Sequence, residues 1–125
     1  MEFFRELQGE RDAEKLWRDL TIERLPEFCD QIDRVLSIDG DQGVVYCLWG
    51  QFDVRRERIR GGVRFSLPGC PNALAWTLTT GLDPRPAATV VHCTINRREH
   101  DPDFIESIEM FCDGFAEGLS ACRGG

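Results

Sequence analysis

Apolar residues recur at every second position between Val44 and Asn96, and this alternation constrains the fold more than any other feature. A period of two is typical of β-strands that bury one face, and glycine and proline mark the turns between them. The pattern predicts four strands, at residues 44–54, 59–67, 73–80 and 88–96. The segments 55–58, 68–72 and 81–87 are predicted connections.

Helical spacing of apolar residues is the pattern on both sides of this region. It predicts an amphipathic helix within residues 1–20, peripheral to the domain or involved in assembly, and a second helix over 23–36. A long C-terminal helix should follow Asp101, whose carboxylate is a suitable N-cap, with Pro102 at the first helical position.

The order of these elements predicts one α+β domain over residues 1–125. We expect a two-layer α-α-β-β-β-β-α arrangement, in which a four-stranded antiparallel meander carries the N-terminal helices and the long C-terminal helix on one face. The helices should cover an apolar strand face made of Phe52, Ile59, Val63, Phe65, Leu67, Leu74, Trp76 and Leu78. The other face should be polar and open to water.

Arginines are concentrated in one segment of an otherwise acidic chain. The net charge is −7, yet residues 55–64 hold five arginines against Glu57, which leaves −11 on the remainder. We predict that this segment and a nearby tryptophan form a partner-binding surface on the open face. Its residues are Trp49, Arg55, Arg56, Arg58, Arg60 and Arg64.

Three roles are open for such a surface. It could be a solvated sheet face, a contact with acidic protein surface, or a platform for single-stranded nucleic acid. Nucleic acid is disfavoured because the sequence pI is about 4.8 and only Trp49 interleaves with the arginines. The leading hypothesis is a non-enzymatic interaction or accessory domain, a homodimer or a binder of another protein.

An anionic small molecule in the cleft between sheet and helices is the alternative, with His92 as the candidate acid–base group. His100 has no assigned role. The sequence contains no catalytic motif, no zinc-ligand spacing and no phosphate or dinucleotide loop, so we expect no catalytic residues, metal or cofactor.

The six cysteines are predicted to be reduced, because apolar neighbours surround most of them and no secretory leader is recognisable. Cys70 lies in a predicted turn, and whether it is reactive is open. No segment has the length of apolar sequence needed to cross a membrane, so a cytoplasmic location is expected.

In size, low pI, mixed α/β content and its long C-terminal amphipathic helix, the chain resembles the small acidic secretion chaperones. That resemblance implies a dimeric, chaperone-like or adaptor function. The predicted strand order departs from that family, which places a helix within the sheet.

Overall fold

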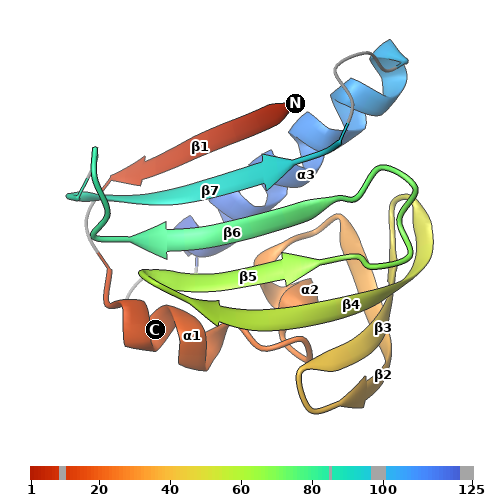
Figure 1. Cartoon of the computed structure of the whole chain (residues 1–125), viewed down its shortest axis with the longest axis horizontal. Helices are drawn as coiled ribbons and strands as arrows, with labels where there is room; N and C mark the ends of the chain where they lie inside the picture. The colour runs from red at the N-terminus through yellow and green to blue at the C-terminus, as the bar shows by residue number, and fades with distance from the viewer. Residues whose placement is uncertain (9–10, 85, 97–100, 122–125) are drawn as a thin grey trace.

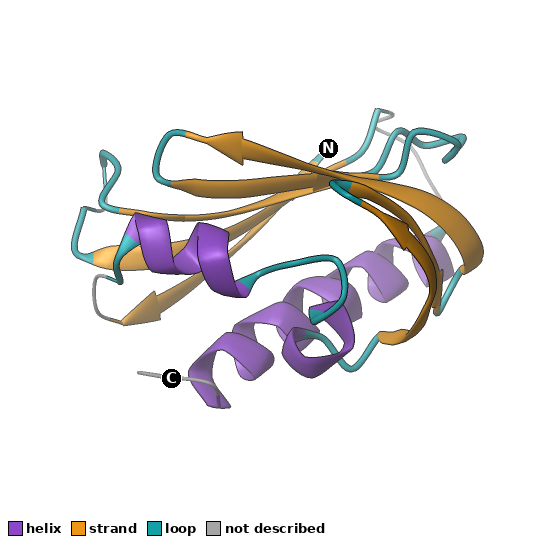
Figure 2. Cartoon of the chain, turned by 90° about the horizontal axis from the view of Figure 1, so that it is seen from below, coloured by secondary structure: helices purple, strands orange, loops and turns teal. Residues whose placement is uncertain are grey.

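The residues that the structure describes form a single seven-stranded antiparallel sheet, which carries the helices on one face (Figures 1 and 2). The computed structural model describes all residues except 9–10, 85, 97–100 and 122–125. The strands are β1 (Glu2–Gln8), β2 (Ile32–Asp39), β3 (Gln42–Cys47), β4 (Gly50–Ile59), β5 (Gly62–Ser66), β6 (Ala75–Thr80) and β7 (Ala88–Thr94). The helices are α1 (Ala13–Asp19), α2 (Leu25–Phe28) and α3 (Pro102–Ala121). The strand order is β1-β7-β6-β5-β4-β3-β2, so the first strand lies beside the last.

The four-stranded meander is therefore wrong: the sheet has seven strands, and the structure corrects the fold prediction at three places. The first is the N-terminus, where Glu2–Gln8 of the predicted helix form strand β1 and, of its described residues, only Ala13–Asp19 are helical. In β1 the side chains of Phe3, Arg5 and Leu7 point to the helix side and alternate with exposed residues. The period of two was hidden because its central inward residue is an arginine, which forms an ion pair with Asp113 of α3.

The second correction concerns residues 23–36. Only Leu25–Phe28 are helical there, and Ile32–Asp39 form the edge strand β2. The register of β2 against β3 shifts twice, between Ile32 and Arg34 and again between Val35 and Ser37. Each shift is a β-bulge that adds one residue to the strand, so its apolar residues fall at intervals resembling helical spacing.

The third correction is the predicted long strand at 44–54. It is two strands, β3 and β4, joined by a tight turn in which Cys47 is opposite Gly50. Gly50 has φ +109°, a conformation that glycine adopts without steric cost. The arginines of 55–58, predicted to form a connection, lie inside β4, and the chain turns instead at Arg60–Gly61.

The remaining elements confirm the sequence-based predictions. The helix α3 begins at Pro102, and the carboxylate of Asp101 accepts a hydrogen bond from the backbone N–H of Asp103 at 2.8 Å. The predicted apolar strand face is the one that meets the helices. Val63, Phe65, Leu67, Leu74, Trp76 and Leu78 are buried there, and Phe52 is half-buried. Ile59 is the exception: it follows Arg58, which is opposite buried Val63, so the half-buried side chain of Ile59 lies on the open face.

Aromatic side chains fill the space between α3 and the sheet. The ring of Trp76 lies 4.9 Å from that of Phe111 and 5.7 Å from that of Phe115, and Phe65 stacks on Trp76 at 5.5 Å. Such ring pairs add to the free energy gained by burying their apolar surface. No helix among the described residues is long and apolar enough to cross a membrane.

Candidate functional site

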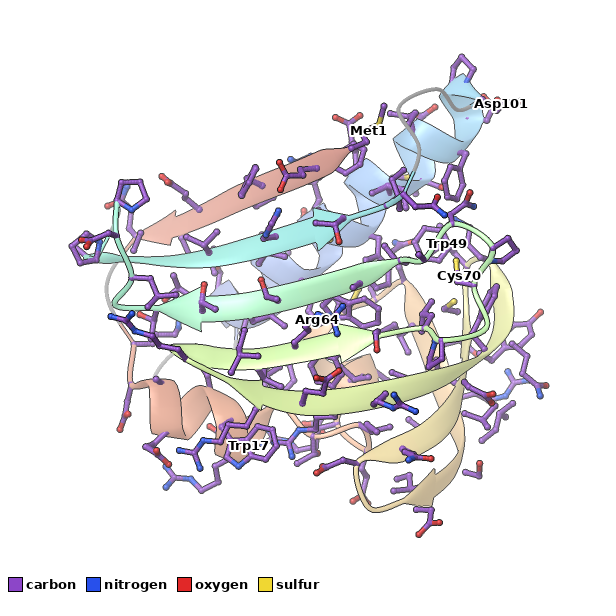
Figure 3. The ribbon with its side chains drawn as sticks, in the orientation of Figure 1. Met1, Trp17, Trp49, Arg64, Cys70 and Asp101 are labelled. Carbon is purple, nitrogen blue, oxygen red and sulfur yellow. The ribbon has the colours of Figure 1, made fainter. Side chains whose placement is uncertain are left out.

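The arginine segment is divided between the two faces of the sheet, contrary to prediction. In the β4–β5 register, Arg58 is opposite buried Val63, so its side chain lies on the helix side. Arg64 is opposite Glu57 and lies on the open face, near the centre of the sheet (Figure 3). These two arginines therefore do not act together on one surface.

Arg56 is a structural residue, with only 9% of its side chain exposed. Its guanidinium lies 3.5 Å from the centre of the Trp17 ring and donates to the backbone carbonyls of Trp17 and Leu20, the latter at 2.8 Å. It also pairs with Asp41 at 3.2 Å. Arg56 therefore satisfies carbonyls at the end of α1 and fixes that helix to the sheet.

Two more of the predicted partner-binding arginines have intramolecular partners. Arg58 pairs with Glu14 of α1, and Arg64 pairs with Glu57 at 3.0 Å. Arg55 and Arg60 are exposed and make no ion pair with any residue that the structure describes. Among the described contacts, Arg55 and Arg60 are therefore the arginines of the segment whose guanidinium groups are not already paired with a carboxylate of this chain.

His92 lies on the open face, not in the cleft between sheet and helices. Its ring stacks on that of Phe4 at 4.2 Å, and its Nε2 is 3.0 Å from a carboxylate oxygen of Glu2. In the register of the sheet it is opposite Thr77, which is itself opposite Arg64. His92 is therefore not in that cleft, and an acid–base role for it stays a prediction; His100 is outside the described residues.

Trp49 is in the β3–β4 turn and contacts α3, where it helps to form a pocket of about 200 Å³. We call this hollow the mouth pocket. It is lined by eight residues from the β3–β4 turn, β4, the β5–β6 connection and the start of α3. They are Trp49, Phe52, Leu67, Cys70, Pro71, Asn72, Leu74 and Phe104. Figure 3 shows Trp49 and Cys70 close together at this end of the sheet.

The walls of the mouth pocket are held in place by their own contacts. The indole N–H of Trp49 donates to Ser107 Oγ at 2.8 Å, and Ser107 Oγ–H donates to the carbonyl of Phe104 at 2.6 Å. The Trp49 ring is 6.2 Å from Phe104 and 5.0 Å from Phe111. Half-buried aromatic rings fixed in this way give the pocket an apolar surface that does not have to rearrange on binding.

The inner end of the aromatic cluster contains a polar group without a partner. Trp76 is 1% exposed, and its Nε1 has no hydrogen-bond acceptor among the described residues. A buried N–H of this kind costs about 1–3 kcal/mol.

Cys70 is the only half-exposed cysteine in the part of the chain that the structure describes. The neighbouring Cys47 is buried, and this burial raises its pKa. No group of three or more potential metal ligands occurs among the described residues. Larger hollows, of about 510 and 350 Å³, are open grooves along β2 lined partly by charged residues.

Sequence reasoning missed the mouth pocket because its residues come from separate segments with no shared motif. The local spacing of apolar residues places Leu74 and Phe52 on the apolar strand face, and Phe104 on the apolar face of the C-terminal helix. The only signal present was Trp49, which was assigned to the wrong surface.

Comparison with known proteins identifies the fold but no family. No family model matches the chain, and no curated protein is similar to it in sequence. Among solved structures, the protein XoxI from Bacillus cereus shares the fold with a TM-score of 0.64 and 14% identity, over 98% of this chain and 93% of that one. A putative uncharacterised protein from Bacillus thuringiensis gives 0.62 and 14%, over 98% and 96%.

A third solved structure defines the class of fold. It is a START superfamily protein from Mycobacterium smegmatis, with a TM-score of 0.60 and 12% identity over 98% of each chain. The antiparallel sheet that wraps around a C-terminal helix is thus a START-like, helix-grip arrangement. At these identities the likeness concerns the fold alone.

Proposed function

We propose that this protein binds a small, neutral, apolar molecule in the mouth pocket. The observation that carries the proposal is the set of three half-buried aromatic rings, Trp49, Phe52 and Phe104, around one hollow. Binding pockets are mostly lined by apolar and aromatic side chains with few polar groups. None of the eight lining residues has a charged side chain, which favours a neutral ligand over the anion considered from the sequence.

The size of the pocket limits the ligand. Its volume of about 200 Å³ is below the range of about 300–1,000 Å³ typical of drug-sized ligands. A molecule with one aromatic ring or a short hydrocarbon chain fits this space. The side chain of Asn72 is the polar group at the rim that could orient such a molecule.

The test uses 4-fluorobenzyl alcohol as a probe, followed by fluorine NMR. Saturable line broadening is expected with the wild-type protein. Cys70→Phe fills the pocket and should weaken binding about tenfold or more, whereas Leu48→Phe adds the same ring at an exposed position outside the pocket and should bind as the wild type does. Absence of binding to the wild type, or equal binding by Cys70→Phe, would contradict the proposal.

A protein contact through the arginine segment is the second candidate. It is supported by Arg55 and Arg60, which are exposed and make no ion pair with a described residue, in a chain of net charge −7. The solution mass should show a dimer at low salt that dissociates at high salt, because exposed charge pairs are screened. Arg55→Glu/Arg60→Glu should abolish it and Arg34→Glu, on β2, should not. A monomer at low salt would exclude self-association.

A further inference from the structure

Two cysteines meet at the junction of α3 and the sheet. Cys93 of β7 and Cys112 of α3 are both fully buried, and their Sγ atoms are 2.7 Å apart and hydrogen-bonded. This distance is well inside ordinary non-bonded contact between sulfurs and somewhat longer than the bond of a disulfide, about 2.05 Å. The two Cβ–Sγ bonds therefore already point toward each other across the layer boundary.

We propose that Cys93 and Cys112 form a reversible disulfide that fastens α3 to β7 when the protein meets a small oxidant such as hydrogen peroxide. In the described structure both cysteines are free thiols. Joining them requires the two sulfurs to approach from 2.7 Å to about 2.05 Å.

The surroundings of the pair decide which sulfur reacts first. The hydrogen bond between the two sulfurs and the nearby Arg5 guanidinium both lower the pKa of Cys112, whereas the pKa of Cys93 is raised. Arg5 itself is anchored by its contact of 2.5 Å with Asp113, the residue after Cys112. Its side chain is 29% exposed, so a surface residue of β1 contacts α3 directly beside Cys112.

The reaction proceeds in two balanced steps. The Cys112 thiolate attacks one oxygen of hydrogen peroxide, the O–O bond breaks, and the leaving hydroxide takes up a proton to become water. The sulfur of Cys93 then attacks the sulfenic acid of Cys112, the S–S bond forms, and a second water leaves with the thiol proton. In sum two thiols are oxidised and one peroxide is reduced to two waters.

Cys29 is an internal control within the same layer. Its Sγ is near the carbonyl of Phe111, at 3.7 Å, and makes no hydrogen bond to either sulfur of the pair. Burial raises the pKa of Cys29 to about 12. It therefore remains a thiol at neutral pH and should not compete with Cys112 for the oxidant.

The experiment treats the folded protein with hydrogen peroxide, blocks remaining thiols after unfolding, and maps the linked peptides by mass spectrometry. Arg97 and Arg98 lie between the two cysteines, so trypsin separates them. The expected result is one Cys93–Cys112 link, removed by dithiothreitol, with a rise of roughly 10 °C in Tm for the oxidised protein. Cys29→Ser should keep the link, and Cys112→Ser should abolish it.

Two results would overturn the proposal. One is a wild-type protein whose Cys93 and Cys112 are still alkylated after treatment that oxidises Cys70. The other is a link that joins Cys29 to either sulfur. Both are read on the wild-type chain, so they do not depend on whether a serine variant folds. The outcome is also independent of whether the mouth pocket binds a ligand.

Discussion

Replacing Gly118 by alanine should destabilise the protein, although the same change usually stabilises a helix. Gly118 faces the backbone of α2, and a Cβ atom there would be 1.9 Å from the carbonyl oxygen of Phe28 and 2.4 Å from its carbonyl carbon. Both are backbone atoms, so no rotation of a side chain relieves the overlap.

The magnitude follows from the distance that has to be restored. Ordinary contact begins at 3.4 Å, so α2 and α3 would have to separate by about 1.5 Å along this line. That separation loosens Leu25 and Phe28, which are 0% and 4% exposed. Overpacking of this kind costs about 1–3 kcal/mol or more, against a gain of about 1 kcal/mol in helix propensity. Because the overlapping atoms are backbone, the cost is expected at about 3 kcal/mol, so the net loss is about 2 kcal/mol, or a fall of roughly 8 °C in Tm.

Thermal and urea unfolding followed by circular dichroism provide the measurement. Ser120→Ala, at an exposed position of the same helix, is the control for propensity and should change stability by less than about 0.5 kcal/mol. Gly114→Ala should give an intermediate loss, since the overlapping atoms are Asp30 Oδ1 at 2.8 Å and Cys29 Sγ at 2.9 Å, both in side chains. A Gly118→Ala protein as stable as the wild type would refute the reasoning.

Three further changes test the contacts described above. Arg56→Ala should cost about 2–3 kcal/mol in urea unfolding, because the carbonyls of Trp17 and Leu20 lose their buried donor. Arg58→Ala should cost under about 1 kcal/mol, because its ion pair with Glu14 is exposed. Equal losses in the two variants would contradict this reasoning. Trp76→Phe removes an N–H that has no acceptor among the described residues, so it should lower the free energy of unfolding less than Phe111→Leu does. The reverse order would argue that the N–H has a partner. The rate at which peroxide links Cys93 to Cys112 should rise with pH as the Cys112 thiolate forms. Arg5→Gln should shift that rise to higher pH, because it removes a positive charge that lowers the pKa of Cys112. An unshifted pH profile would exclude the role of Arg5.

Regular local patterns predicted the part of the fold that they describe. The strands β5, β6 and β7 and the helix α3 follow a clean period and clear capping residues, and these were predicted correctly. The two edge strands were predicted as helices. In β1 a half-buried arginine interrupts the apolar alternation, and in β2 two bulges change its phase. Their identity depends on partners far away in the chain, which local spacing does not contain.

The site could be predicted even less from the sequence. Counting arginines locates a charged segment. Whether each arginine is free to bind a partner depends on contacts with Trp17, Glu14, Asp41 and Glu57, which only the tertiary structure shows. The mouth pocket depends likewise on a turn after Cys47 that redirects Trp49 toward α3.

The position of β1 has a consequence for the order in which the protein folds. Residues 2–8 leave the ribosome before residues 88–94, which form their hydrogen-bonded neighbour in the sheet. Contacts between such distant segments carry a large loop-closure entropy and form slowly. The hairpins of β2–β5 can form during synthesis, whereas β1 stays unpaired until β7 has been synthesised. We therefore expect its amides to become protected from hydrogen exchange last during refolding.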